Sequence, residues 1–321
     1  DGDKCRYDGD GVLRAVANVN NVIAPELIGF NPSDQGMADG KLLALDPTPQ
    51  KSELGANAIL GVSLAVAHAG AAIRNIPLYR HVHELLAALG GNSMPQPQMP
   101  LPMTNMISGG LRAGHNLDFQ DVLIMPVAAP DMTTALEWIV RVYRRLGELL
   151  TAAGYEGRLV GDEGGYGPQL ESNEQAIELV IRAIDTAKLR PGDDVTLALD
   201  IAATHFYCGS HYHLASERDA QCTSTEMVDR LMQLVDKYPI TSIEDGLGEE
   251  DWSGWQELTR RLGSHIQIVG DDLFTTNSLR LQRGIETGVA NSVLVKVNQI
   301  GTLTETLSTI NMARKAGYSC V

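Results

Sequence analysis

The sequence predicts an α/β protein: a (β/α) barrel preceded by a smaller, mostly helical N-terminal domain. From residue 96 onward, short apolar runs typical of strands alternate with segments of helical period, which is the pattern of parallel βαβ units. Residues 11–88 carry helical patterns without a convincing strand. The stretch 90–102 concentrates Gly and Pro, which exclude a helix. We therefore expect two domains, over residues 1–95 and 96–321.

Apolar periodicity predicts the N-terminal helices. One helical face is formed by Val12, Leu13, Val16, Val19 and Ile23. The apolar stretch 56–73 approaches the length of a membrane span, but it consists mainly of small residues and includes polar ones, His68 among them. We predict that this stretch is a closely packed core helix, that His68 lies in the core, and that the chain has no membrane span.

The barrel region begins with two strands followed by two helices. The strands are predicted at 102–108 and 121–127, and the helices near 131–153 and 172–189. A Ser-x-x-Gln capping pattern marks the start of the second helix. This opening differs from the simple alternation that follows it.

After these helices, four apolar runs each end in one charged residue: Asp200, Glu244, Asp271 and Lys296. The intervening helices are expected from about 226, near 253–262, near 278–287 and over 303–316, with a last strand beginning near 318. Such alternation predicts parallel strands. We count seven strands where a closed barrel needs eight, so we expect the sequence to be part of a longer protein.

The charged strand ends predict a metal site. A parallel strand buried on both faces cannot carry charge along its length, so charge gathers where the strand emerges. Three carboxylates at one mouth repel one another unless a cation neutralises them, and Mg²⁺ prefers such oxygen ligands. An ammonium beside the ion is disfavoured, so Lys296 is a candidate base near neutral pH. Each residue alone also fits a simpler role: an acid as a helix cap, and Lys296 as a buried ion-pair partner.

Two further segments supply candidate polar loops. The segment 161–168 (GDEGGYGP) holds Glu163 on a tight Gly-rich turn, where it is a candidate general acid. Neither GxxxxGK[ST] nor GxGxxG occurs there, which disfavours nucleotide binding. The segment 109–121 (GGLRAGHNLDFQD) supplies Arg112, Gln120 and Asp121 just before a strand.

Charge and cysteine usage exclude some functions. The net charge of −15 argues against a nucleic-acid surface, which needs clustered Lys and Arg. The four cysteines show no CxxC or paired spacing, so we expect reduced thiols and a cytoplasmic location.

Five blocks of the sequence resemble the enolase (phosphopyruvate hydratase) family. They are KSELGANAILGVSLA (51–65), VGDEGGYGP (160–168), SIEDGLGEEDW (242–252), VGDDLFTTN (269–277) and KVNQIGTLTET (296–306). The likeness runs in the same order along the whole chain. It implies an α+β cap domain, a barrel with a ββαα start, and usually a homodimer. It also implies a lyase of glycolysis that dehydrates 2-phosphoglycerate to phosphoenolpyruvate reversibly.

The resemblance also assigns roles to residues. The ligands of Mg²⁺ would be Asp200, Glu244 and Asp271. Enolase-superfamily enzymes generally combine Mg²⁺ with a lysine or histidine base. Lys296 would remove the proton from C2 of the substrate, Glu163 would protonate the departing C3 hydroxyl, and Gln120, Asp121 and Arg112 would contact substrate. The family's serine loop and its phosphate clamp with a second lysine are expected outside this sequence, and without them we expect no turnover.

The chain departs from the family at four places. Arg112 replaces His, Asp121 replaces Glu, Thr204-His205-Phe206 replaces Ser-Glu-Phe, and Gly246 replaces Pro. Arg112 cannot shuttle a proton as His does. The alternative function is therefore a degenerate paralogue that keeps the fold and metal site for binding or scaffolding. A third hypothesis is a related enzyme acting on another carboxylate, but the block 296–306 is too close to enolase to favour it.

Overall fold

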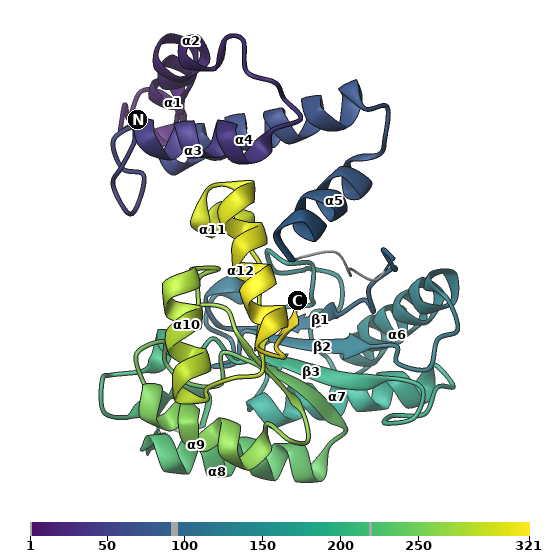
Figure 1. Cartoon of the computed structure of the whole chain (residues 1–321). Helices are drawn as coiled ribbons and strands as arrows, with labels where there is room; N and C mark the ends of the chain where they lie inside the picture. The colour runs from purple at the N-terminus through teal and green to yellow at the C-terminus, as the bar shows by residue number, and fades with distance from the viewer. Residues whose placement is uncertain (1, 91–95, 218–219) are drawn as a thin grey trace. The chain divides into compact units, whose positions relative to one another are not determined.

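The computed structural model describes residues 2–90, 96–217 and 220–321, and the chain in it divides into two compact units (Figure 1). The first comprises Asp1–Pro97, Phe274–Arg283 and Val293–Val321. The second comprises Gln98–Leu273 and Gly284–Ser292. The expected domain boundary at residue 95 lies outside the described residues.

Helices make up most of the first unit, as the periodicity predicts. Its N-terminal helices are α1 (Leu13–Asn18), α2 (Ala24–Leu27), α3 (Gln35–Leu45), α4 (Ala56–Ile73) and α5 (Leu78–Gly90), with short turns η1 (Tyr7–Gly9) and η2 (Val19–Ile23). Later segments add α11 (Val297–Ile300), α12 (Leu303–Lys315) and β9 (Ser319–Cys320). In the described part of residues 1–90, no residue lies in a strand.

Two apolar clusters stabilise the first unit. One joins η2, α3 and α4 through Ile23, Leu42 and Ile59. The other joins α4 to α12 through Ala67, Leu303 and Leu307. The apolar face predicted over residues 12–23 is only partly used: Ile23 in η2 is buried, whereas Val12, Leu13 and Val16 are exposed.

Helix α4 carries polar contacts as well as apolar ones. Its Ser63 accepts a hydrogen bond from the N–H of Leu303 at 3.0 Å. By length and composition α4 is the one helix of the described residues that could cross a membrane, with a mean hydropathy of 1.6 and a third of its residues buried. Core helices pass the same test, so this is weak evidence for a span. The prediction for His68 is wrong, because its side chain is exposed.

The second unit contains the sheet and its covering helices. Its strands are β1 (Thr104–Ser108), β2 (Asp121–Met125), β3 (Thr196–Asp200), β6 (Ile240–Glu244) and β7 (Gln267–Gly270), with a separate hairpin of β4 (Tyr212–Leu214) and β5 (Ala220–Cys222). Short turns η3 (Gly110–Ala113), η4 (Ala203–Phe206) and η5 (Ala215–Glu217) connect them. The helices are α6 (Met132–Ala152), α7 (Asn173–Thr186), α8 (Ser224–Lys237) and α9 (Trp252–Leu262). Two elements cross the limit between the units: α10 (Ser278–Thr287) and β8 (Ser292–Val293).

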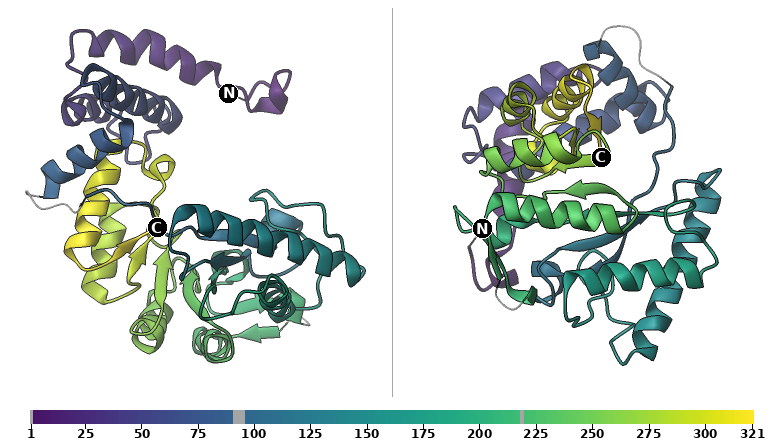
Figure 2. Two further views of the ribbon diagram at one scale, coloured as in Figure 1. Left: turned by 90° about the vertical axis from the view of Figure 1, so that its right-hand side faces the viewer. Right: turned by 90° about the horizontal axis from the view of Figure 1, so that it is seen from below.

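The strand order in this unit is β1-β2-β3-β6-β7. The pairs β1–β2 and β2–β3 are antiparallel, whereas β3–β6 and β6–β7 are parallel. The predicted ββαα start and the following parallel strands are thus confirmed. Helix α6 packs against α7 and α8 against α9, to the outside of the strands (Figures 1 and 2). Across the strands that the structure describes, no pairing closes this order into a ring.

Local signals explain where the helices begin. Thr223 and Glu226 form a complete capping box at α8, so two of its free N–H groups find acceptors. At α7, the Ser172 hydroxyl accepts from the N–H of Gln175, but the Gln175 side chain accepts from Glu171 instead. The predicted cap of α7 is therefore half of a capping box.

Candidate active site at the strand ends

The three predicted metal ligands lie at the carboxyl ends of neighbouring parallel strands. Asp200 ends β3, Glu244 ends β6, and Asp271 directly follows β7. Asp200 and Glu244 are partners in the β3–β6 register. Because parallel strands present their carboxyl ends at one edge, the ladder brings these acids together.

Burial and like charge dominate the electrostatics of this edge. The pKa of Asp200 is raised well above its ordinary value of 3.8, first by burial and then by neighbouring carboxylates. These neighbours are Glu244, Asp245, Asp121 and Asp271. Buried carboxylates that repel one another in this way are stabilised by a bound cation or by shared protons.

Gln120 orients the Asp200 carboxylate. Its side-chain Nε2 donates to Asp200 Oδ2 at 2.8 Å, and its backbone N–H donates to the Asp200 carbonyl at 3.0 Å. The second oxygen, Oδ1, accepts from the N–H of Ala202 at 3.1 Å. Both carboxylate oxygens are thereby fixed in direction, and outer contacts of this kind are what orient carboxylate ligands at metal sites.

Asp121 and Glu163 form a close acid pair. Asp121 is 2% exposed and accepts a hydrogen bond from Asn105. Its pKa is raised to about 7, first by burial and then by the charge of Glu163, with which it shares a hydrogen bond. Two carboxylates this close cannot both ionise easily, so the pair retains a proton near neutral pH.

The turn that carries Glu163 is held by backbone contacts with β1. The N–H of Gly161 donates to Gly165 at 2.8 Å, and Tyr166 exchanges hydrogen bonds with Met106 and Ser108. At Gly165 an added Cβ would lie 2.6 Å from Asn105 Oδ1, so only glycine fits without a shift. The glycine therefore lets the turn approach the residue that binds Asp121.

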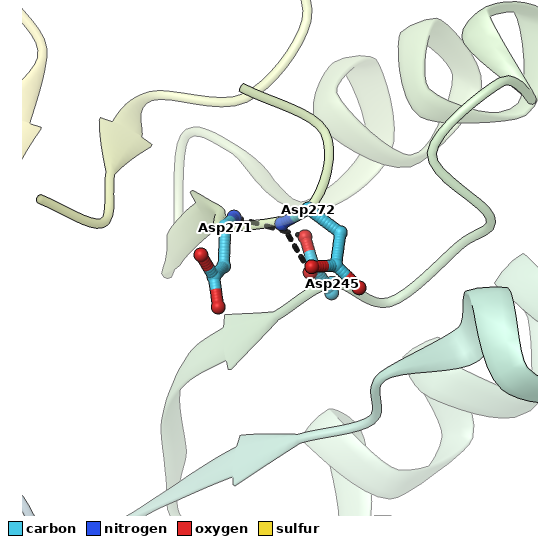
Figure 3. A group of neighbouring side chains, drawn as sticks. All are labelled: Asp245, Asp271 and Asp272. Atoms are coloured by element: carbon cyan, nitrogen blue, oxygen red, sulfur yellow. Dashed lines mark hydrogen bonds between the residues drawn. The ribbon is translucent and has the colours of Figure 1, made fainter. Parts of the chain in front are cut away.

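Two acids that the sequence reasoning missed lie beside the predicted ligands. Oxygen atoms of Asp245, Asp271 and Asp272 all lie within 4.8 Å of one another (Figure 3). Asp245 Oδ1 accepts from the N–H of Asp271 at 3.0 Å, and its Oδ2 accepts from the N–H of Asp272 at 2.7 Å. Burial raises the pKa of Asp245 to about 8, although the two N–H groups oppose this. The sequence offers one signal for them, since Asp245 and Asp272 each directly follow a predicted ligand.

The donor set fits a hard divalent cation. Every ligand candidate here is a carboxylate, which Mg²⁺, Mn²⁺ and Ca²⁺ prefer over nitrogen or sulfur. Oxygens on opposite sides of a Ca²⁺ ion lie about 5 Å apart, and those on opposite sides of Mg²⁺ about 4 Å apart. A spacing of up to 4.8 Å is therefore within reach of one Ca²⁺ ion and is slightly wider than one Mg²⁺ ion spans. In Figure 3 the side chains of Asp271 and Asp272 leave the turn in different directions. The Asp245 carboxylate binds the backbone N–H groups of these two residues and so stabilises the turn.

Lys296 belongs to the first compact unit and lies beyond the observed end of the strand that is predicted to finish at this residue. Strand β8 ends at Val293, and Lys296 is the residue before α11. Pairing with Val321 continues to Val295, whose N–H donates to Val321 at 2.8 Å. At Lys296 the N–H turns instead to the Thr276 hydroxyl, at 2.8 Å. The predicted strand end is therefore wrong by three residues, because the Thr276 side chain accepts the Lys296 N–H in place of a strand partner.

The segment of Arg112 borders a cavity in the second unit. The backbone of Arg112 lies in η3, and its side chain is outside the described part of the structure. The cavity has a volume of about 440 Å³, and its lining includes Gly110, His115, His205 and His213. Room for a small polar molecule thus exists next to this predicted substrate segment.

The fold and site define an α/β protein with a cluster of strand-end carboxylates suited to a divalent cation. Comparison with known families agrees with this class. Residues 96–321 match the family model "Enolase, C-terminal TIM barrel domain", and residues 1–82 match "Enolase, N-terminal domain". The chain belongs to the enolase family, a family of generally metal-dependent, lyase-type enzymes that act on small molecules.

Proposed function

We propose that this protein is an enolase: a Mg²⁺-dependent lyase of glycolysis and gluconeogenesis that interconverts 2-phosphoglycerate and phosphoenolpyruvate. The observation that carries the proposal is the cluster of buried acids around Asp200 in a chain of this family. Such a cluster is costly in the absence of a cation, because burial and mutual repulsion both oppose ionisation. A role in binding a metal explains why it is present.

The proposed metal ligands are Asp200, Glu244 and Asp271. Mg²⁺ bound there would supply positive charge that lowers the free-energy barrier to removing a proton from the carbon beside the substrate carboxylate. Gln120 is proposed to hold Asp200 in direction and to contact substrate, because its Nε2 donates to Asp200 at 2.8 Å. Asp245 keeps the turn of Asp271 in place through two backbone hydrogen bonds.

Lys296 is proposed as the base that removes the C2 proton. Proton transfer by a positioned amine requires that part of it be neutral, and a nearby cation favours the neutral form. Glu163 is proposed as the acid that protonates the departing C3 hydroxyl. Glu163 shares a hydrogen bond with Asp121, whose pKa is raised to about 7 by burial and by the charge of Glu163. A carboxyl group that can hold a proton near neutral pH therefore lies directly beside the proposed acid.

The remaining expectations are part of the same proposal. Asp121 and Arg112 are proposed to contact substrate, and the protein is proposed to be a cytoplasmic homodimer that binds no nucleic acid. The four cysteines are thiols in the described structure, and three of them are exposed, which supports a reducing location.

The test is the appearance of phosphoenolpyruvate absorbance when full-length protein is given 2-phosphoglycerate and Mg²⁺. We expect product with Mg²⁺ and none after chelation with EDTA, because the acids alone cannot stabilise the developing charge. Product formation that is equal with and without EDTA would contradict the proposal, and so would no product under either condition.

A second candidate is a degenerate paralogue with a binding or scaffolding role. The replacements at Arg112, Asp121 and His205 favour it, because they change charge or reach at positions that the family uses. Titration calorimetry separates the two candidates. Heat from Mg²⁺ but none from 2-phosphoglycerate would support the paralogue, whereas heat from both supports the enzyme.

A further inference from the structure

Thr276 is buried beside the backbone of the proposed base. It lies in the first compact unit, as Lys296 does, and its side chain is 0% exposed. Its hydroxyl accepts the N–H of Lys296 at 2.8 Å. The N–H at this position has left the β8–β9 ladder, so the hydroxyl takes the place of a strand partner.

The hydroxyl can accept this N–H because its own proton is directed elsewhere. It donates toward Gln299 Oε1 at 3.2 Å, with the Leu294 carbonyl as a second acceptor at 3.4 Å. A threonine hydroxyl has one proton and two lone pairs, so donation to Gln299 leaves a lone pair for Lys296. Thr276 thus joins both ends of α11, the short helix that Lys296 precedes.

The backbone of Thr276 is fixed in an unfavourable conformation. Thr275 and Thr276 both have positive φ, at 47° and 53°, which β-branched residues rarely adopt. The Thr276 carbonyl accepts from the Thr309 hydroxyl of α12 at 2.9 Å. Strain of this kind persists only where surrounding contacts impose it, and it is frequent at functional sites.

Sequence position gives this residue a second connection. Thr276 follows Asp271 and Asp272 by only five and four residues, within the block VGDDLFTTN. One short segment therefore carries candidate metal ligands at its start and the partner of the Lys296 backbone near its end. We infer that Thr276 is a positioning residue for the reaction, which sets the placement of Lys296 through the hydrogen bond to its N–H. This inference depends on the proposed function, in which Lys296 is the base.

The test compares three variants of the full-length enzyme by exchange of the C2 proton of 2-phosphoglycerate in D₂O with Mg²⁺. Thr276→Val keeps the shape but removes the hydroxyl, and Thr276→Ser keeps the hydroxyl. Thr275→Val is the matched control, because within the described residues the Thr275 hydroxyl donates to the adjacent Phe274 carbonyl and not to the segment of Lys296. Displacing a catalytic group by about 1 Å costs roughly 10²-fold, so we expect a loss of ~10–100-fold in kcat for Thr276→Val.

We expect KM and Mg²⁺ affinity of Thr276→Val to stay within about twofold of wild type. Exchange by Thr276→Ser and by Thr275→Val should stay within about threefold of wild type, since neither of these two substitutions removes the hydrogen bond to the Lys296 N–H. Normal exchange by a folded Thr276→Val would overturn the inference, and so would equal losses in all three variants. If Thr276→Val does not fold, Gln299→Leu replaces it, because this variant removes the acceptor of the Thr276 hydroxyl proton. A loss of about threefold to tenfold in the exchange rate would support the inference, and exchange at the wild-type rate would overturn it. Absence of exchange by the wild-type enzyme would instead contradict the proposed function.

Discussion

The two compact units present their candidate functional groups in different ways. In the second unit, Asp200 and Glu244 end regular parallel strands, and the register between the strands sets their positions. In the first unit, Lys296 stands where a strand gives way to a four-residue helix, and a single buried hydroxyl takes its N–H. The acids are thus positioned by a repeating ladder, whereas the proposed base is positioned by individual side chains.

The difference extends to charge. The second unit buries carboxylates whose pKa values are raised by burial and by one another. The first unit buries His81, whose pKa is lowered by burial and by Arg74. Protonation of these buried carboxylates therefore favours the folded second unit, whereas protonation of His81 disfavours the folded first unit, so near neutral pH these two sets of groups should make stability respond to pH in opposite senses.

The largest effect that we expect comes from removing the proposed base. Lys296→Ala should lower C2 proton exchange by about 10³-fold or more, because no other group is proposed to accept that proton. Mg²⁺ affinity, measured by calorimetry, should stay nearly unchanged, since the proposed ligands are carboxylates. Lys315→Ala, which alters an exposed lysine of α12, serves as the control and should behave as wild type. Exchange by Lys296→Ala at the control rate would rule out this role.

Removing the proposed acid should separate the two half-reactions. Glu163→Gln should retain C2 exchange but lower dehydration by roughly 10²- to 10⁴-fold, because it cannot protonate the departing hydroxyl. Asp162→Asn changes the adjacent exposed acid on the same turn and should leave both rates unchanged. If Glu163→Gln lost both reactions equally, our division of roles between Glu163 and Lys296 would be wrong.

Metal and pH should act together on the second unit. Asp121 and Asp245 have pKa values near 7 and 8, above their ordinary 3.8, so the folded state holds protons that the unfolded state releases. In EDTA, stability should therefore fall as the pH rises from about 4 to about 8. Mg²⁺ at a hundredfold excess over its Kd should restore about 3 kcal/mol at pH 8. Hydrogen exchange of β3 and β6 measures this, and equal protection with and without Mg²⁺ would contradict it.

The first unit should lose stability in the opposite direction. His81 is 0% exposed, and burial and the charge of Arg74 lower its pKa below the ordinary 6.5, although Glu84 opposes this. The unfolded chain thus takes up a proton that the folded unit resists, and stability falls as the pH drops below about 6.5. Amide exchange in α4 and α5 should show this loss. His81→Gln should remove it, whereas replacement of the exposed His68 by Gln should not.

Regular elements of this fold could be predicted from the sequence, because periodicity and caps are local signals. The strands ending at Asp200 and Glu244, the two helices after β2, and the parallel order were all predicted, and the structure confirms them. The acids at those ends followed from the same reasoning, since a buried strand excludes charge except where it emerges.

Positions that depend on single tertiary contacts could not be predicted. The apolar run before Lys296 gives no sign that Thr276, twenty residues earlier, ends the ladder. Asp245 was missed because its role arises from the backbone N–H groups of Asp271 and Asp272, which a sequence pattern does not display. The sequence predicts one apolar helical face over Val12, Leu13, Val16, Val19 and Ile23, but periodicity does not show which partner covers such a face, and Val12, Leu13 and Val16 are exposed.

Metal-dependent proton abstraction is tested by deuterium uptake at C2 of 2-phosphoglycerate by the wild-type, full-length protein, followed by NMR with magnesium or with chelator. We expect rapid uptake that depends entirely on the metal. Uptake that persists in the chelator, or a failure to exchange while magnesium is shown to be bound, would contradict it.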